Sequence, residues 1–185
     1  MLTKVYKEYF FFRAMKRGQI WVETVIYTLI GLAIIGLVLA GALPKINQKK
    51  DEMTIGRSIE ALGNIDDKVY EVSRAAGNRR VVNLDIKKGS FVVNPAEDSI
   101  SWILDSSFAY SEVGSTVPFG NINVTTTENG DYQVELKIGY KVDLRYAGDD
   151  VKEKTFSVAP TPYLIVIENT GKNLDGNIVV DFSEA

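Results

Sequence analysis

The feature that most constrains this chain is an uncharged apolar stretch near its N-terminus. Residues 24–44 contain no charged side chain, and more than half of them are Val, Ile or Leu. As a helix rising 1.5 Å per residue, residues 20–43 would extend about 36 Å, which exceeds the roughly 30 Å hydrocarbon core of a bilayer. Helices of soluble domains rarely run so far without a charge, so we predict a membrane span over residues 20–43.

Charges on either side of this span predict its orientation. Five basic residues precede it, against the single acid Glu8, and they are Lys4, Lys7, Arg13, Lys16 and Arg17. Three lysines follow it. Since basic residues are retained on the cytoplasmic side, we expect a cytoplasmic N-terminus and a C-terminal domain outside the cell.

Composition argues against several classes of function. The chain of 185 residues has 24 acidic and 21 basic residues and a net charge of −3, which disfavours nucleic-acid binding. It contains neither Cys nor His, so thiolate chemistry, disulfides and the commonest general base and metal ligand are missing. We therefore expect no enzymatic activity, no cofactor, and no catalytic or metal-binding residues.

A short motif lies immediately before the span. The basic pair Lys16-Arg17 is followed by Gly18 and Gln19, and Glu23 stands at the edge of the apolar run. An ordinary secretory signal peptide has a shorter apolar region, placed before its cleavage site. A carboxylate at the edge of a bilayer costs up to roughly 2–3 kcal/mol, so Glu23 calls for a partner. The alternative, in which Glu23 simply reaches the headgroup level, is left open.

These residues, over positions 14–50, resemble the class III signal peptide of archaeal type IV pilin-like proteins. The resemblance implies that the membrane-embedded prepilin peptidase cuts between Gly18 and Gln19, after the basic residues Lys16 and Arg17. It also implies that Glu23 becomes the fifth mature residue and takes part in assembly. Its expected partners are the membrane, the peptidase, and other copies of itself or related pilins in a cell-surface filament.

Two classes of function therefore remain. The first is a filament subunit that serves adhesion, motility or surface display, with an archaellum subunit as one case. The second is a membrane-anchored extracellular binding module that never polymerises. The resemblance does not extend into the C-terminal domain, so it gives no ligand for that domain.

The remainder of the chain predicts an α+β fold: a long N-terminal transmembrane and amphipathic α-helix followed by a small antiparallel β-sandwich. Beyond Pro44, apolar residues recur at mostly three- and four-residue steps, from Ile46 and Met53 as far as Val72. This spacing indicates an amphipathic helix to about residue 76. Short segments with alternating polarity follow, at 81–86, 90–94, 99–104, 121–127, 155–158, 163–168 and 177–182. We divide the chain into a leader (1–18), a long helix (19–77) and an extracellular β-domain (78–185).

Some details of the β-domain are also predicted. Strict alternation over residues 132–146 predicts one long strand with a bend or bulge at Gly139, joined to the preceding strand by an Asn129-Gly130 turn. Asn123 begins an N-glycosylation sequon, Asn123-Val124-Thr125. Five aspartates could bind calcium but lack a spaced loop signature, so we interpret them as surface turn residues: Asp66, Asp67, Asp149, Asp150 and Asp175.

We predict cleavage after Gly18. N-terminal sequencing of protein extracted from membranes should begin at Gln19, and replacing Gly18 by a bulky residue should leave a membrane-bound species longer by the leader. A start at Met1, or near Gly41, would contradict the class III assignment.

Overall fold

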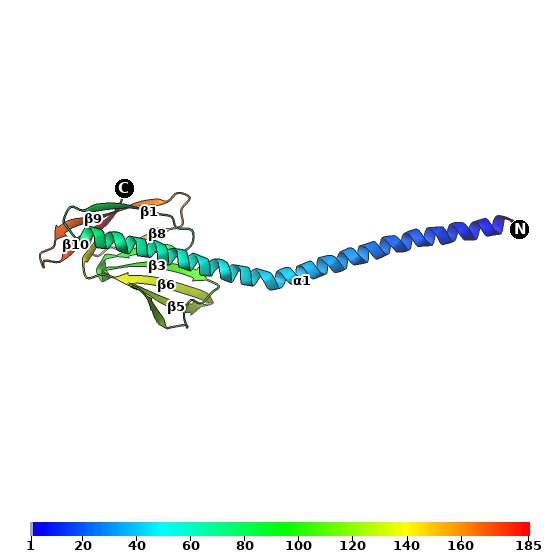
Figure 1. The fold of residues 1–185 in the computed structure, drawn as a ribbon, viewed down its shortest axis with the longest axis horizontal. Helices are drawn as coiled ribbons and strands as arrows, with labels where there is room; N and C mark the ends of the chain where they lie inside the picture. Colours follow the sequence, from blue (N-terminus) through cyan, green and yellow to red (C-terminus); the bar gives the residue numbers. More distant parts are fainter. Residues whose placement is uncertain (1) are drawn as a thin grey trace. The chain divides into compact units, whose positions relative to one another are not determined.

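The computed structural model describes the backbone of residues 2–185 and the side chains of residues 21–128 and 130–185. One helix, α1 (Leu2–Ser73), precedes all the strands (Figure 1). The chain divides into two compact units, residues 1–46 and 47–185. Helix α1 begins earlier than the expected 19 and ends four residues before the expected 77, and it continues through Pro44.

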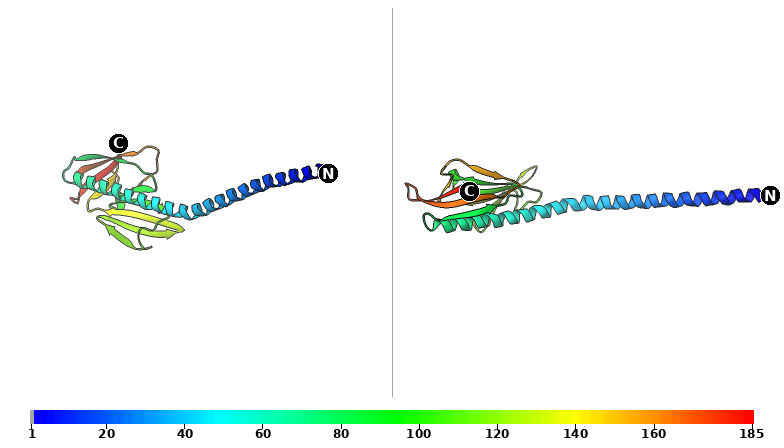
Figure 2. Two further views of the ribbon diagram at one scale, coloured as in Figure 1. Left: turned by 45° about the vertical axis from the view of Figure 1, so that its right-hand side comes forward. Right: turned by 90° about the horizontal axis from the view of Figure 1, so that it is seen from above.

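Residues 47–73 of helix α1 run alongside the strands (Figure 2) and bury one apolar face against them. The buried positions recur at three- and four-residue steps, and they are Ile55, Ile59, Leu62, Ile65, Val69 and Val72. Ile46 and Met53, which the apolar spacing placed on the same stripe, are exposed instead. The apolar face of residues 55–72 is therefore packed within the core of the chain's own domain.

The strands form two sheets, as the expected sandwich requires. The four-stranded sheet has the order β1-β9-β10-β7, and the six-stranded sheet has the order β4-β5-β6-β3-β2-β8. All neighbours are antiparallel except β10 and β7. The strands are β1 (Arg79–Leu84), β2 (Ser90–Asn94), β3 (Ser99–Ser106), β4 (Thr116–Phe119), β5 (Ile122–Asn129), β6 (Asp131–Gly139), β7 (Asp143–Tyr146), β8 (Lys154–Ser157), β9 (Tyr163–Lys172) and β10 (Ile178–Glu184). A short 3-10 helix, Pro95–Glu97, joins β2 to β3.

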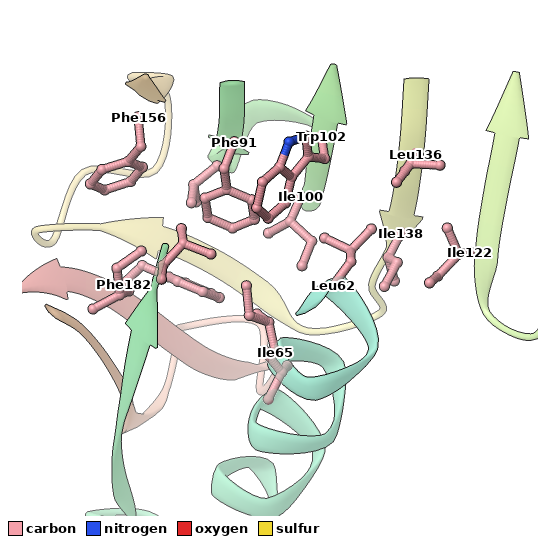
Figure 3. Close-up of a cluster of buried hydrophobic side chains, with 14 of the residues drawn as sticks. Leu62, Ile65, Phe91, Ile100, Trp102, Ile122, Leu136, Ile138, Phe156 and Phe182 are labelled. Carbon is pink, nitrogen blue, oxygen red and sulfur yellow. The ribbon is translucent and has the colours of Figure 1, made fainter. Parts of the chain in front are cut away.

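Both sheets and the helix contribute to a single hydrophobic core (Figure 3). Phe91 and Trp102 from the six-stranded sheet meet edge to face, with ring centroids 6.0 Å apart. Leu62 and Ile65 of the helix, and Phe182 of the four-stranded sheet, lie in the same cluster. The helix therefore belongs to the core of the domain and does not merely lead into it.

The prediction of one bent strand over residues 132–146 is wrong. Strand β6 belongs to the six-stranded sheet and ends at Gly139. The chain then crosses to the four-stranded sheet, where β7 pairs with β10 in parallel. Asp98 stabilises the crossing, since its carbonyl accepts the N–H of Tyr140 and its carboxylate accepts the N–H of Leu144, both at 2.8 Å. The alternation continues across the break because both strands turn their apolar side chains into one shared core.

Strands β4 and β5 give one confirmed prediction and one strand that was not predicted. The Asn129-Gly130 hairpin between β5 and β6 is confirmed, with Gly130 at a φ of +88° that favours glycine. Strand β4 was not predicted. It contains Pro118 and lies at a sheet edge, where a residue without an N–H is tolerated.

The C-terminal end of helix α1 is held by Asn169 of β9, a polar residue that is only 3% exposed. Its side-chain amide donates to the carbonyl of Val72 at 3.0 Å and accepts from the N–H of Gly171 at 2.9 Å. The N–H of Gly77 in turn donates to the Asn169 carbonyl at 2.8 Å. The last carbonyls of a helix lack partners within the helix, so this contact fixes where α1 ends.

We expect Asn169→Ala to destabilise the domain by about 1–3 kcal/mol. The change removes the buried hydrogen bond to the Val72 carbonyl, which keeps only the longer bond from the N–H of Ala75 at 3.4 Å, and it takes the side-chain partner from the half-buried N–H of Gly171. Denaturant unfolding of a soluble fragment over residues 47–185 measures this. Thr170→Ala, at the exposed neighbouring position, is the matched control. Equal stability of the two variants would contradict the role given to Asn169.

Candidate membrane and assembly surface

The first unit presents an apolar helix surface that the chain itself leaves uncovered. From Trp21 onward the described helix is long and apolar enough to cross a membrane, and none of its most apolar 18 residues is buried. Trp21 is 72% exposed and Leu37 is 77% exposed. Each such side chain gains about 1.5–3 kcal/mol when it is moved out of water, so an apolar environment would stabilise this surface.

Glu23 lies at the start of this surface and is exposed. Its carboxylate makes no ion pair with any side chain in the described part of the protein. The side chains of Lys16, Arg17 and Gln19 lie outside the described residues, and at Gly18 only the helical backbone is described. Since Gln19 precedes Glu23 by four residues in one helix, both belong to the same helix face.

Small residues interrupt the apolar surface at Gly31, Gly36 and Gly41. A Cβ atom built at any of the three would meet nothing within 4 Å beyond its chain neighbours and the adjacent backbone of the same helix. The backbone there is open to close approach, and Gly36 and Ala40 have the small-xxx-small spacing found between packed membrane helices.

Where the helix enters the β-domain, Asp51 connects it to two loops. Its carboxylate pairs with the ammonium of Lys88 and accepts the N–H and the hydroxyl of Ser107, at 2.8 and 2.7 Å. Burial raises the pKa of Asp51, but the hydrogen bonds from Lys88 and Ser107 outweigh it, so the pKa lies below the ordinary value of 3.8. Asp51 was not among the predicted site residues. The available signal was its spacing, since it stands one helical turn before the buried Ile55.

Asn123 is exposed in strand β5, between Pro118 of β4 and Lys137 of β6. The hydroxyl of Thr125, the third residue of the sequon, lies 2.8 Å from the hydroxyl of Thr116. The Asn123 side chain is accessible to an attached glycan, and its glycosylation stays a prediction.

The aspartates considered for calcium lie in separate places. Asp66 accepts a hydrogen bond from the side chain of Asn121 at 3.0 Å, and Asp149 accepts the N–H groups of Val151 and Lys152, each at 2.9 Å. Within the part of the chain that the structure describes, no three acidic side chains lie close enough together to hold a metal ion. Asp149 thus stabilises a turn, in line with the interpretation given above.

Comparisons with protein families, with curated proteins and with solved structures find no match to this chain.

We expect Asp51→Asn to destabilise the domain at neutral pH by about 1–3 kcal/mol, because the charge-assisted hydrogen bonds are lost. A carboxyl whose pKa is lowered by folding contributes fully above its unfolded pKa and loses that contribution as the pH falls through the folded value. The difference in the free energy of unfolding between wild type and variant should therefore be full at about pH 6–7 and disappear well below about pH 4. Denaturant unfolding at several pH values measures it, and a gap independent of pH would contradict this account.

Proposed function

We propose that this protein is a structural subunit of an extracellular filament of the type IV pilus kind. Its N-terminal helices would form the filament core, and its β-domains would form the outer surface. The observation that carries the proposal is the contrast along helix α1. Residues 55–72 bury their apolar face in the chain's own domain, whereas the large apolar side chains of residues 21–43 are exposed and have no cover from the described chain.

Processing would prepare the chain for assembly. The prepilin peptidase would remove the leader at Gly18, leaving a free ammonium at Gln19 while the apolar helix stays in the membrane. Removal of the leader takes five basic residues and one acidic residue from the chain, so the mature protein has 16 basic and 23 acidic residues and a net charge of −7. The mature domain would lie outside the cell and become part of a surface filament.

In a bundle of such helices the Gln19 ammonium of one subunit could pair with Glu23 of its neighbour. Both charges would otherwise be unpaired in an apolar environment, so the pair would fix the stagger between subunits. The carboxylate of Glu23 is exposed and makes no ion pair with another described side chain, as this role requires.

The alternative function is a membrane-anchored binding module that does not polymerise. The same exposed helix supports it, because lipid alone could cover an apolar segment of this length. Electron microscopy of cells that express the chain, with a label on the β-domain, separates the two. Labelled filaments support the subunit, whereas uniform membrane labelling without filaments supports the anchored module.

We expect Glu23→Gln to leave membrane insertion unchanged and to abolish filaments. Each added subunit would bury an ammonium without its partner, at a cost of about 3–5 kcal/mol, which is on the order of a thousandfold in the equilibrium of subunit addition. The two measurements are the processed protein in membranes and the protein in sheared filaments.

Glu60→Gln is the matched control, since Glu60 is an exposed carboxylate on the same helix beyond the apolar segment. The control should assemble like the wild type. Normal filaments from Glu23→Gln would show that this carboxylate is not needed for assembly.

A further inference from the structure

The end of the β-domain at which helix α1 terminates, here called the far end, carries a polar hollow of about 550 Å³. Tyr70 and Arg74 line it from the helix side, and Arg80 of strand β1 lines it from the sheet. Tyr70 is 65% exposed, and the Arg74 guanidinium lies over its ring at 4.8 Å from the centroid. Tyr and Arg, together with Trp, are enriched among the residues that contribute most binding energy at protein interfaces.

The cations around this hollow outnumber the carboxylates that neutralise them. Glu71 accepts from both Lys68, at 2.8 Å, and Arg80, at 2.9 Å, and these two hydrogen bonds lower its pKa. Arg74 has no carboxylate partner among the described side chains. With Asp67 included, the charged residues of the hollow sum to +1, whereas residues 47–185 have 15 basic and 22 acidic residues, a net charge of −7.

The opposite end of the domain, the near end at which the helix enters, carries an acidic hairpin tip. Strand β6 runs from this end to the far end (Figure 1), and its first residues follow the tight turn at Gly130. Tyr132 pairs with Ser106, and the adjacent Ser107 binds Asp51 of the entering helix, so the turn lies at the near end. Glu128 and Asp131 flank the turn, both are exposed, and neither makes an ion pair with another described side chain.

The two surfaces lie at opposite ends of a domain whose helix, over residues 47–73, is about 40 Å long. A basic hollow at one end and an acidic projection at the other cannot pair within one copy. They can pair between copies that are displaced along the helix direction. A contact between two different surfaces of identical chains repeats without closing when the displacement has an axial component, and it then builds a filament.

We propose that the hairpin tip carrying Glu128 and Asp131 docks into the Tyr70–Arg74 hollow of a second copy, as a head-to-tail contact between the β-domains of neighbouring subunits. The contact deepens the proposed function and rests on it. Arg74 would pair with Asp131 across the contact, and the exposed Tyr70 ring would be covered by the incoming hairpin. Such pairing contributes chiefly to partner choice and orientation, since like charges placed opposite each other repel.

Charge exchange in the full-length chain tests this contact. We expect Arg74→Glu and Asp131→Arg, each alone, to lower the protein recovered in sheared filaments by about tenfold or more, with normal processed protein in the membrane. The double variant, which restores opposite charges in exchanged positions, should recover filaments to within about threefold of the wild type. Lys141→Glu and Asp175→Arg make the same charge changes at exposed positions outside both surfaces, and we expect both to assemble normally.

The outcomes separate this contact from the filament itself. Wild-type filaments that persist in both single variants would overturn the contact and leave the filament function standing. Loss in the single variants without recovery in the double variant would overturn the Arg74–Asp131 pairing. Absence of filaments from the wild-type chain would overturn the proposed function, and this contact with it.

Discussion

Packing of helix α1 against two sheets is the interaction on which the rest of the structure depends. Six apolar side chains between Ile55 and Val72 enter the core that contains Phe91, Trp102 and Phe182. Each gains about 1.5–3 kcal/mol from burial, so the helix is among the larger contributors to the core. Because the core residues of both sheets meet the same helix, the sheets and the helix hold one another in place.

Two polar contacts determine where this packing begins and ends. Asp51 attaches the entering helix to the loops that carry Lys88 and Ser107, and Asn169 takes up the carbonyl of Val72 at the helix end. Between these points the helix is a fixed part of the domain. Before Asp51 its apolar surface has no cover from the described chain, and this difference along the helix is the basis of the function proposed above.

Much of the fold could be predicted from the chain because its signals are local. Spacing of three and four residues gave the helix face from Ile55 to Val72, and alternation with turn residues gave strand β2 with its observed bounds. The predictions that were wrong or missing concern contacts between residues far apart in the sequence. Alternation over residues 132–146 specifies which side chains face the core, but it cannot specify that the core is bounded by two different sheets. Asn169 was missed for the same reason, since its partner Val72 is 97 residues away in the sequence.

The sequence by itself determined the apolar span, its flanking charges, the Lys16–Glu23 motif and the helix-then-strands order, because each depends on residues close together along the chain. Only the tertiary structure decided that the amphipathic face of the helix is buried within its own domain, that β7 pairs in parallel with β10, and that Arg74 and Asp131 lie at opposite ends of the domain. These features depend on which distant segments share a core. Burial of apolar side chains is non-directional, so it stabilises many such pairings by similar amounts. Hydrogen bonds such as those of Asp51, Asp98 and Asn169 favour one pairing over the others, but they form only after the partners have come together.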